Sequence, residues 1–286
     1  MTAATSSVSA PTVAVKQKQT EVLRITGAII FLLSGIYHVD WWRLVQDPIV
    51  VPLSMYTEGA KLTVAYLTAL LAWRIDPMSC WDETDFKALR IIYSLIAVAD
   101  TCFIAQQPDA GILVFMIVQG LFIKRHLSGM TSISELTAQS PLVILVFGIS
   151  AVLCAANATF FWYPRTGGFN DLFIILSIYF CLKCTSLTAT YAACLIGKFP
   201  LWNAQMTAVG MTMFFICDHT VTGNLLLSQD PTTTDAPFYV VTSSLTWMFY
   251  GPALLLLSLS GYHPDILLVL APNHQIDASS ATKKKE

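Results

Sequence analysis

A small set of ionisable residues lies within or at the edge of long hydrophobic segments, where charge is rare. The set comprises Glu58, Lys61, Asp100, Lys183, Asp218 and His219. An ionisable side chain at bilayer depth costs several kcal/mol and commonly marks a functional site. Two neighbouring carboxyl groups in a medium of low dielectric constant cannot both ionise easily, so one of them stays protonated. Asp100 and Asp218 are therefore the candidate catalytic residues of an acid/base pair.

The elements that must position these residues are hydrophobic helices. The chain has 286 residues, of which 55% are hydrophobic and 12% are charged, against roughly 25% charged in a soluble domain. A bilayer-spanning helix needs about 20 mostly apolar residues. Apolar segments lie at residues 25–39, 58–73, 88–106, 110–123, 141–162, 171–196, 201–221 and 238–260. The sequence thus predicts an all-α polytopic membrane protein, a bundle of about eight transmembrane helices.

Three regions follow from this pattern. We expect a disordered cytosolic tail over residues 1–22, a single transmembrane helical domain over 23–262 and a cytosolic C-terminal tail over 263–286. Residues 40–57 contain Trp41, Trp42 and Tyr56, and aromatic residues favour the headgroup level of a membrane. We expect that segment to be interfacial.

The basic residues predict the orientation. With eight spans and a cytosolic N-terminus, twelve lysines and arginines lie on the cytosolic side and three on the other side. The twelve are Lys16, Lys18, Arg24, Arg74, Lys87, Arg90, Lys124, Arg125, Lys198, Lys283, Lys284 and Lys285, and the three are Arg43, Lys61 and Arg165. This is a strong positive-inside bias, so both termini should face the cytosol. The ending Lys283-Lys284-Lys285-Glu286 resembles a dilysine retrieval signal of endoplasmic reticulum membrane proteins, with a simple solvated basic tail as the alternative.

Other classes of site are disfavoured. The net charge of −2 argues against a nucleic-acid partner. Six of the seven cysteines fall in apolar runs, where Cys packs as a small hydrophobic residue. Cys181-Leu-Lys-Cys184 has redox spacing but lies in mid-span without a second pair, so packing is the preferred interpretation. The sequence has no phosphate-binding glycine loop, nucleophile triad or zinc spacing, and we expect no cofactor or metal.

Topology predicts where the ionisable residues gather. Asp100 and Asp218 fall near the non-cytosolic ends of their spans, at about 1.5 Å of rise per residue. A single polar cluster should include them with His38, Asp40, Glu58 and Lys61. Lys183 lies near the middle of its span, where a structural ion pair with one aspartate is the preferred interpretation. A Schiff-base lysine of the rhodopsin kind is disfavoured, because rhodopsins carry that lysine in their last span.

The seventh hydrophobic segment carries a motif. Gly210, Phe214 and Asp218 follow one another at four-residue steps, with Cys217 before the aspartate. This series resembles that of the YhhN-type membrane proteins, which include the lysoplasmalogenases and have Ser where this chain has Cys217. Lys61 is similar to a lysine of that family at the start of the second span.

The other motifs occur in the same order over roughly residues 55–262. Ala99-Asp100 resembles the family's Gly-Asp step, and Gly111, Phe115 and Gln119 resemble its Gly, Phe and His series. Gln119 thus replaces a titratable histidine, which bears on whether the family's activity is kept. The closing motif is similar at Tyr250, Ala253, Leu256, Leu257 and Ser260, with Leu254 in place of a usual Gln.

The resemblance implies a hydrolase that cleaves the vinyl ether of a lysophospholipid into a fatty aldehyde and a glycerophospho-headgroup. Cleavage begins with protonation of the β carbon and forms an oxocarbenium ion, which water captures. Asp100 and Asp218 would supply the acid and the stabilising anion, in either order. The candidate substrate-binding residues are Lys61, Gln119, Lys183, His219 and Tyr250. The expected partners are a lipid or other amphiphilic substrate and the bilayer, and a homodimer is compatible with them.

Two other functions fit the same residues. A membrane-bound enzyme of the terpene-cyclase kind also begins by protonating an alkene and would use the same acids without water. A non-enzymatic lipid-binding or transport protein would use the aspartates only as partners of Lys183.

Overall fold

The structure is a computed structural model that describes residues 13–46, 55–129, 141–163, 166–227 and 236–267. Within these residues the fold is all-helical, apart from an isolated bridge between Cys80 and Tyr262. The elements are α1 (Val13–Gln46), α2 (Met55–Trp73), α3 (Glu83–Ile104), α4 (Pro108–Leu127), α6 (Pro141–Ala156), the π-helix η1 (Asn157–Trp162), α8 (Asp171–Leu195), α9 (Leu201–Leu227), α10 (Ala236–Leu259) and α11 (Pro264–Leu267).

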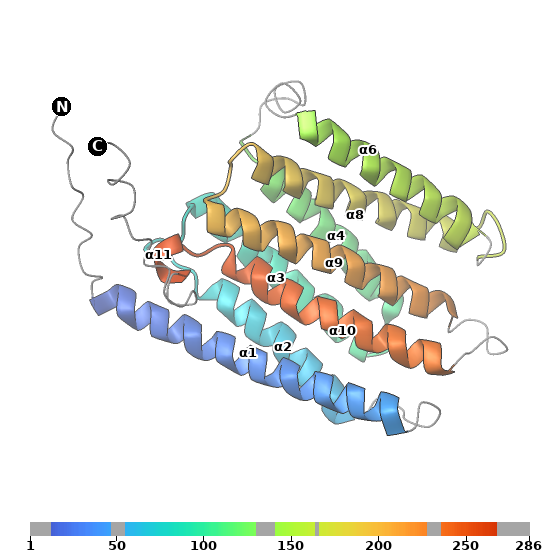
Figure 1. Cartoon of the computed structure of the whole chain (residues 1–286), viewed down its shortest axis with the longest axis horizontal. Helices are drawn as coiled ribbons and strands as arrows, with labels where there is room; N and C mark the ends of the chain where they lie inside the picture. Colours follow the sequence, from blue (N-terminus) through green and yellow to red (C-terminus); the bar gives the residue numbers. More distant parts are fainter. Residues whose placement is uncertain (1–12, 47–54, 130–140, 164–165, 228–235, 268–286) are drawn as a thin grey trace, which may run out of the picture.

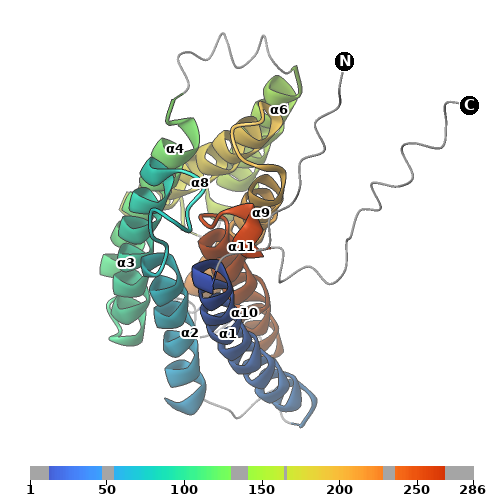
Figure 2. The ribbon, with the colours of Figure 1, turned by 90° about the vertical axis from the view of Figure 1, so that its left-hand side faces the viewer.

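The long helices lie side by side in two layers. One layer consists of α2, α3 and α4, and the other contains α1, α10 and α9 (Figures 1 and 2). Helix α8 packs on both α4 and α9 and so closes one edge, where α6 lies outside it and is continued by η1. Helices α3 and α4 form the tight hairpin that their short connection predicts, with Gln106 in the left-handed region at φ 58°.

The predicted tails are partly wrong. Helix α1 begins at Val13, so residues 13–22 are helical, whereas residues 1–12 lie outside the described residues. Ion pairs join the first turns of α1 to the end of α2 and the loop after it: Lys18 to Asp76 at 3.0 Å, and Glu21 to Arg74 at 3.1 Å. These ion pairs connect the N-terminal turns of α1 to the loop after α2, at a partly exposed surface.

Two further boundaries differ from the prediction. The predicted interfacial segment 40–57 continues α1 as far as Gln46, and residues 47–54 lie outside the described residues. The predicted C-terminal tail begins with helix α11, in which Ile266 and Leu267 are buried against the bundle. Residues 268–286, with the dilysine-like ending, lie outside the described residues.

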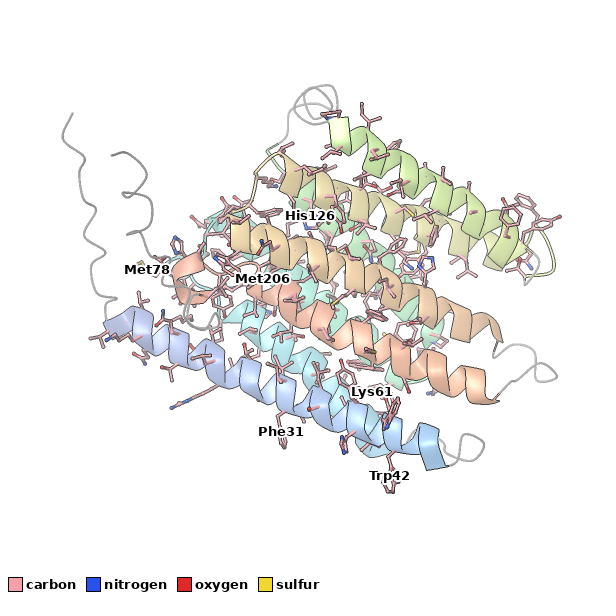
Figure 3. All side chains as sticks on the ribbon, in the orientation of Figure 1. Phe31, Trp42, Lys61, Met78, His126 and Met206 are labelled. Atoms are coloured by element: carbon pink, nitrogen blue, oxygen red, sulfur yellow. The ribbon has the colours of Figure 1, made fainter. Side chains whose placement is uncertain are left out.

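Much of the outer surface is apolar. Among the described residues, four helices are by length and composition able to cross a membrane: Val13–Trp42, Pro108–Leu127, Pro141–Phe160 and Phe173–Leu195. Phe31 and Trp42 point away from the bundle (Figure 3), with 77% and 62% of their surface exposed. Helix α6 also exposes most of its large hydrophobic side chains. Such a surface suits lipid as the solvent.

Polar contacts tie several helices together at one end of the bundle. Arg125 of α4 binds both carboxylate oxygens of Asp85 of α3, at 2.7 and 2.8 Å, and Ser260 Oγ at 3.0 Å. Asn203 of α9 donates to the backbone carbonyls of Ser260 and Tyr262, each at 2.7 Å. These five buried residues form the polar knot, which joins α3, α4 and α9 to the end of α10.

Helix α10 contains a proline in its interior, Pro252. Proline has no backbone N–H, so the carbonyl four residues earlier loses its helical hydrogen bond. That carbonyl belongs to Met248, and the Tyr37 hydroxyl of α1 donates to it at 3.4 Å and to the Trp247 carbonyl at 3.0 Å. The contact from α1 supports α10 where its own ladder is interrupted.

Candidate active site

A cavity of about 200 Å³ lies inside the bundle toward the end opposite the polar knot. Its lining is mostly apolar, but both Asp100 and Asp218 line it. Its other lining residues are Glu58, Lys61, Leu62, Phe103, Ile104, Ile112, Phe115, Leu176, Tyr179, Cys217, Val221, Thr246, Trp247 and Tyr250. Helices α2, α3, α4, α8, α9 and α10 therefore each contribute to one site.

Two hydrogen-bond donors and one ammonium group lie around the Asp218 carboxylate. The Tyr179 hydroxyl donates to Oδ2 at 2.8 Å, and Gln119 Nε2 donates to the same oxygen at 3.4 Å. The Lys183 ammonium lies 3.8 Å from it. The Gln119 amide thus contacts an aspartate inside the bundle. Each donor favours the ionised form of the carboxyl group.

Lys183 is fully buried among aromatic rings. Its ammonium lies 5.2 Å from the ring centre of Tyr179 and 5.5 Å from those of Phe180 and Phe215. A buried ammonium needs a counter-charge, and cation–π contacts supply part of its stabilisation. The predicted ion pair of Lys183 with an aspartate is confirmed, with Asp218 as the partner. Lys183 does not line the cavity, so the carboxylate stands between it and any ligand.

Asp100 has a different environment. The Tyr250 hydroxyl lies 2.8 Å from both of its carboxyl oxygens. Tyr250 in turn stacks on Phe214 at 5.8 Å and meets Trp247 edge-on at 5.2 Å. Its ring is thus fixed by packing, which aims the hydroxyl at Asp100.

Lys61 and Glu58 form a charged pair on the wall of the same cavity. They lie one turn apart on α2, with Nζ 3.1 Å from Oε1. The Lys61 ammonium also lies 5.4 Å from the ring centre of Trp247. The buried lysine is therefore held between a carboxylate and an aromatic face.

The predicted polar cluster is wrong for His38 and Asp40, and the candidate substrate-binding residue His219 does not line the cavity either. His219 packs edge-on against Phe180 at 4.8 Å and donates from Nδ1 to the Phe215 carbonyl at 3.2 Å. Although it follows Asp218 in the chain, it is not a lining residue, because successive side chains of a helix point about 100° apart. His38 is exposed, and Asp40 is buried but does not line the cavity.

Sequence reasoning missed Tyr179. It lies four residues before Lys183 on α8, so the two side chains share a helix face and both reach Asp218. A tyrosine deep inside a span needs a partner for its hydroxyl, and that requirement was the available signal. Ten tyrosines in the chain made the signal weak.

No family model, no curated protein and no solved structure matches this chain. The resemblance to the YhhN-type proteins thus depends on the sequence motifs alone.

Proposed function

We propose that this protein is a multi-pass membrane enzyme with eight spans that hydrolyses the vinyl ether of a lysoplasmalogen-type lysophospholipid. The observation that carries the proposal is the pair of aspartates, differently surrounded, on one apolar cavity. Cleavage of a vinyl ether by two carboxyl groups needs one that is protonated, as the acid, and one that is ionised, as the stabilising anion, so their surroundings must differ. The apolar outer faces of the helices support the membrane location.

The contacts favour Asp100 as the acid. Asp218 accepts from a phenol and an amide and faces an ammonium, so it is the better-stabilised anion. Asp100 has one described hydrogen-bonding partner, the Tyr250 hydroxyl, and forms no ion pair within the described residues. A carboxyl group in such surroundings retains its proton and can donate it.

The proposed reaction then needs only these groups and water. Asp100 gives its proton to the β carbon of the vinyl ether, and positive charge develops on the α carbon and the ether oxygen. The Asp218 carboxylate and the faces of Phe115 and Tyr250 stabilise that cation. Water adds to the α carbon and returns a proton to Asp100, and the resulting hemiacetal breaks into a fatty aldehyde and the glycerophospho-headgroup.

The size and lining of the cavity suit part of a lipid. About 200 Å³ is less than the roughly 300–1,000 Å³ of a pocket for a whole drug-sized ligand. Only the reacting end of the substrate would be enclosed, with its chain in the bilayer. The Lys61–Glu58 pair would contact the headgroup. Location in the endoplasmic reticulum with cytosolic termini belongs to the same proposal. The dilysine-like ending supports the location, and the distribution of basic residues supports the orientation.

The motif positions support the proposal as well. Gly210 lets α9 approach α10 closely, because a Cβ there would lie 2.8 Å from Leu257. Phe214 is fully buried one turn on and stacks on Tyr250, and Asp218 reaches the cavity one turn further. The four-residue steps of the motif therefore follow the face of α9 that builds the site.

A second candidate is favoured by the aromatic walls. Phe103, Phe115, Trp247 and Tyr250 line the cavity, and aromatic faces can stabilise the carbocations of a polyene cyclisation. The same Asp100 would protonate the terminal alkene.

The third candidate, a lipid-binding protein, is favoured by the Lys183–Asp218 pair, which has a structural role whether or not catalysis occurs.

The test uses the full-length protein purified in detergent and a lysoplasmalogen, with free aldehyde measured by mass spectrometry. Asp100→Asn and Asp218→Asn should each abolish aldehyde release, because an amide can neither give the proton nor balance the cation. Asp109→Asn is the matched control, since Asp109 is an exposed carboxylate at the start of α4 and is not a lining residue. A lysophospholipid with an ester in place of the vinyl ether should not react.

Three results would redirect the proposal. A wild-type protein inert on vinyl ethers but active on a polyene would favour the cyclase. Activity gained by Gln119→His alone would show that the family's histidine is required. A protein that binds lipid without converting either substrate would favour the binding role.

A further inference from the structure

A row of polar side chains lies on one face of α8, inside the bundle. They are spaced four, three and four residues apart, which at about 3.6 residues per turn places them above one another. They are Tyr179, Lys183, Ser186 and Thr190, and none exposes more than 6% of its surface. Polar side chains buried within a span are rare and commonly functional, so this face of α8 needs an explanation.

Helices α4 and α9 turn polar side chains toward the same face. Those of α4 are seven residues apart and those of α9 are eleven apart, close to two and three full turns. They are Gln119 and His126 on α4, and Thr207 and Asp218 on α9, all of them buried. At one end Tyr179 and Gln119 both donate to Asp218. At the other end His126 Nδ1 lies 2.8 Å from the Thr190 hydroxyl. These eight residues form the polar stripe.

Five atoms of the polar stripe make no hydrogen bond to the described residues. They are Gln119 Oε1, Lys183 Nζ, Ser186 Oγ, His126 Nε2 and Thr207 Oγ1. Buried polar groups of native proteins are nearly always paired with protein or with ordered water. On the same helix, Thr185 and Thr188 each donate to the carbonyl four residues earlier at 2.8 Å, which Ser186 does not do. The stripe is therefore a place where polar partners are missing from the protein itself.

The unpartnered atoms need both donors and acceptors. The Lys183 ammonium can only donate, and the Asp218 oxygen beside it, at 3.8 Å, is beyond hydrogen-bonding distance. His126 needs a donor instead. The Thr190 hydroxyl gives its one hydrogen to the Ser186 carbonyl at 2.8 Å, so the hydrogen between it and His126 belongs to Nδ1, and Nε2 of the neutral ring is an acceptor. Water can serve both groups, because it donates and accepts.

The spacing of the stripe fits single water molecules. Steps of three and four residues on α8 are rises of about 4.5 and 6 Å. One water between two polar groups spans about 5.6–6 Å, which is two hydrogen bonds of about 2.8–3.0 Å. Thr207 of α9 adds a hydroxyl at the level of Thr190, because the two helices run antiparallel and the Cys194 thiol contacts the Ala204 carbonyl at 3.3 Å. One bridging water thus covers each axial step along α8.

The two ends of the stripe adjoin two cavities. Asp218 lines the cavity of the candidate active site. At the other end, Lys198 donates to the carbonyl of His126 at 3.1 Å and lines a second cavity, of about 610 Å³. The exposed side chains of Lys87 and Lys124 also line this second cavity, so solvent reaches it. The polar stripe therefore runs from a solvent-accessible cavity to the candidate active site.

We propose that the polar stripe binds a row of water molecules that leads from the second cavity to Asp218. Proteins hold about one buried water per 27 residues, and the stripe gathers the polar partners that such waters need. The row supplies the water that vinyl-ether hydrolysis consumes, because the active-site cavity itself has a mostly apolar lining. This use of the row rests on the proposed function, whereas the presence of the row does not.

The test is radiolytic footprinting of the full-length protein in detergent, in which X-rays produce hydroxyl radicals from water and mass spectrometry locates the oxidised side chains. Phe122 is fully buried and stacks on His126 at 5.8 Å. It should be oxidised, because water bound beside it is the source of the radical. Tyr93 of α3 is equally buried, and its hydroxyl binds the Leu254 carbonyl, outside the stripe. It should stay unmodified, although a phenol ring is the more reactive of the two.

Two variants separate the stripe from the rest of the core. Thr207→Val removes one hydroxyl of the stripe and keeps the shape of the side chain. It should lower both the oxidation of Phe122 and the thermal midpoint, because the row of waters loses a partner. Thr188→Val is the matched control, since the buried Thr188 hydroxyl is bonded to Ser150 on the α6 side of α8. It should leave the oxidation of Phe122 unchanged.

Two results would overturn the proposal. One is a wild-type protein in which Phe122 is not oxidised. The other is a higher thermal midpoint in Thr207→Val, because exchanging a dry, unpartnered hydroxyl for a methyl group removes the cost of burying it. Aldehyde release tests the proposed function separately. Oxidation of Phe122 without aldehyde release would keep the row and refute the hydrolysis, and aldehyde release without that oxidation would refute the row.

Discussion

Removing one member of the Lys183–Asp218 pair should lower the free energy of unfolding by several kcal/mol, whereas removing both members should lower it much less. The ammonium and the carboxylate lie 3.8 Å apart and are both buried. At an effective dielectric constant of about 20, two unit charges at that distance attract by about 4 kcal/mol. Loss of one partner leaves an uncompensated buried charge, which typically costs about 3–5 kcal/mol.

A double-mutant cycle measures this coupling. Lys183→Met and Asp218→Asn should each lower the free energy of unfolding by about 3–5 kcal/mol, and the double variant should recover most of that loss. The coupling free energy, which is the sum of the two single losses minus the loss in the double variant, should exceed either single loss, because no lone charge remains in the double variant. Equilibrium unfolding in detergent micelles, followed by tryptophan fluorescence, gives the four values.

Two outcomes would refute the reasoning. Single variants within about 0.5 kcal/mol of the wild type, the range of ordinary surface substitutions, would mean that the two groups are not an ionised buried pair. Aldehyde release by a folded double variant at the wild-type rate would show that the Asp218 carboxylate is not needed for catalysis. A folded but inactive double variant would separate the catalytic role from the structural one.

Three further predictions use other parts of the molecule. Gly210→Ala should lower the free energy of unfolding by about 1–3 kcal/mol, because its Cβ would lie 2.8 Å from Leu257. Gly120→Ala is the control, because a Cβ at Gly120 would meet open space. Equal thermal midpoints of the two variants would contradict the expected clash. Mild oxidation should form a disulfide between Cys154 and Cys181, whose sulfur atoms are 3.2 Å apart. Maleimide labelling should then count two fewer thiols. An unchanged count would show that the helices hold the two thiols in an unreactive geometry. Tags on the two termini should both be reached by a protease from the cytosolic face, and labelling from opposite faces would rule out an even number of spans.

Sequence reasoning located the helices but ended some of them too early, because it treated charge as a boundary. The fourth apolar segment was predicted to end at residue 123, whereas α4 continues to Leu127. Arg125 lies inside that extension and is buried because Asp85 of α3 neutralises it. Pairing between residues 40 positions apart is not visible in a local hydropathy pattern. The early start of α1 has the same cause, since Lys18 finds its partner Asp76 far along the chain.

For the site, depth along each span was the informative quantity. It placed Asp100, Asp218 and Lys61 at the same end of the bundle, and all three line one cavity. Depth gives no direction around a helix axis, so it also included Asp40, which is buried but does not line the cavity. It also gave no reason to select Tyr179, whose hydroxyl reaches Asp218 from α8.

Pro252 has a mechanical consequence for the site. The missing helical hydrogen bond at Pro252 divides α10 into two halves, because kinks and bending in helices concentrate at proline. The half after Pro252 is anchored by the polar knot, and the half before it carries Trp247 and Tyr250, which line the cavity. We expect the half of α10 before Pro252 to tilt while the half after it stays fixed, which would let one wall of the cavity move; the hydrogen bonds from the Tyr37 hydroxyl of α1 would limit the tilt. Spin labels on the two halves of α10 should report a broader distance distribution than in Pro252→Ala, and equally narrow distributions would show a rigid helix.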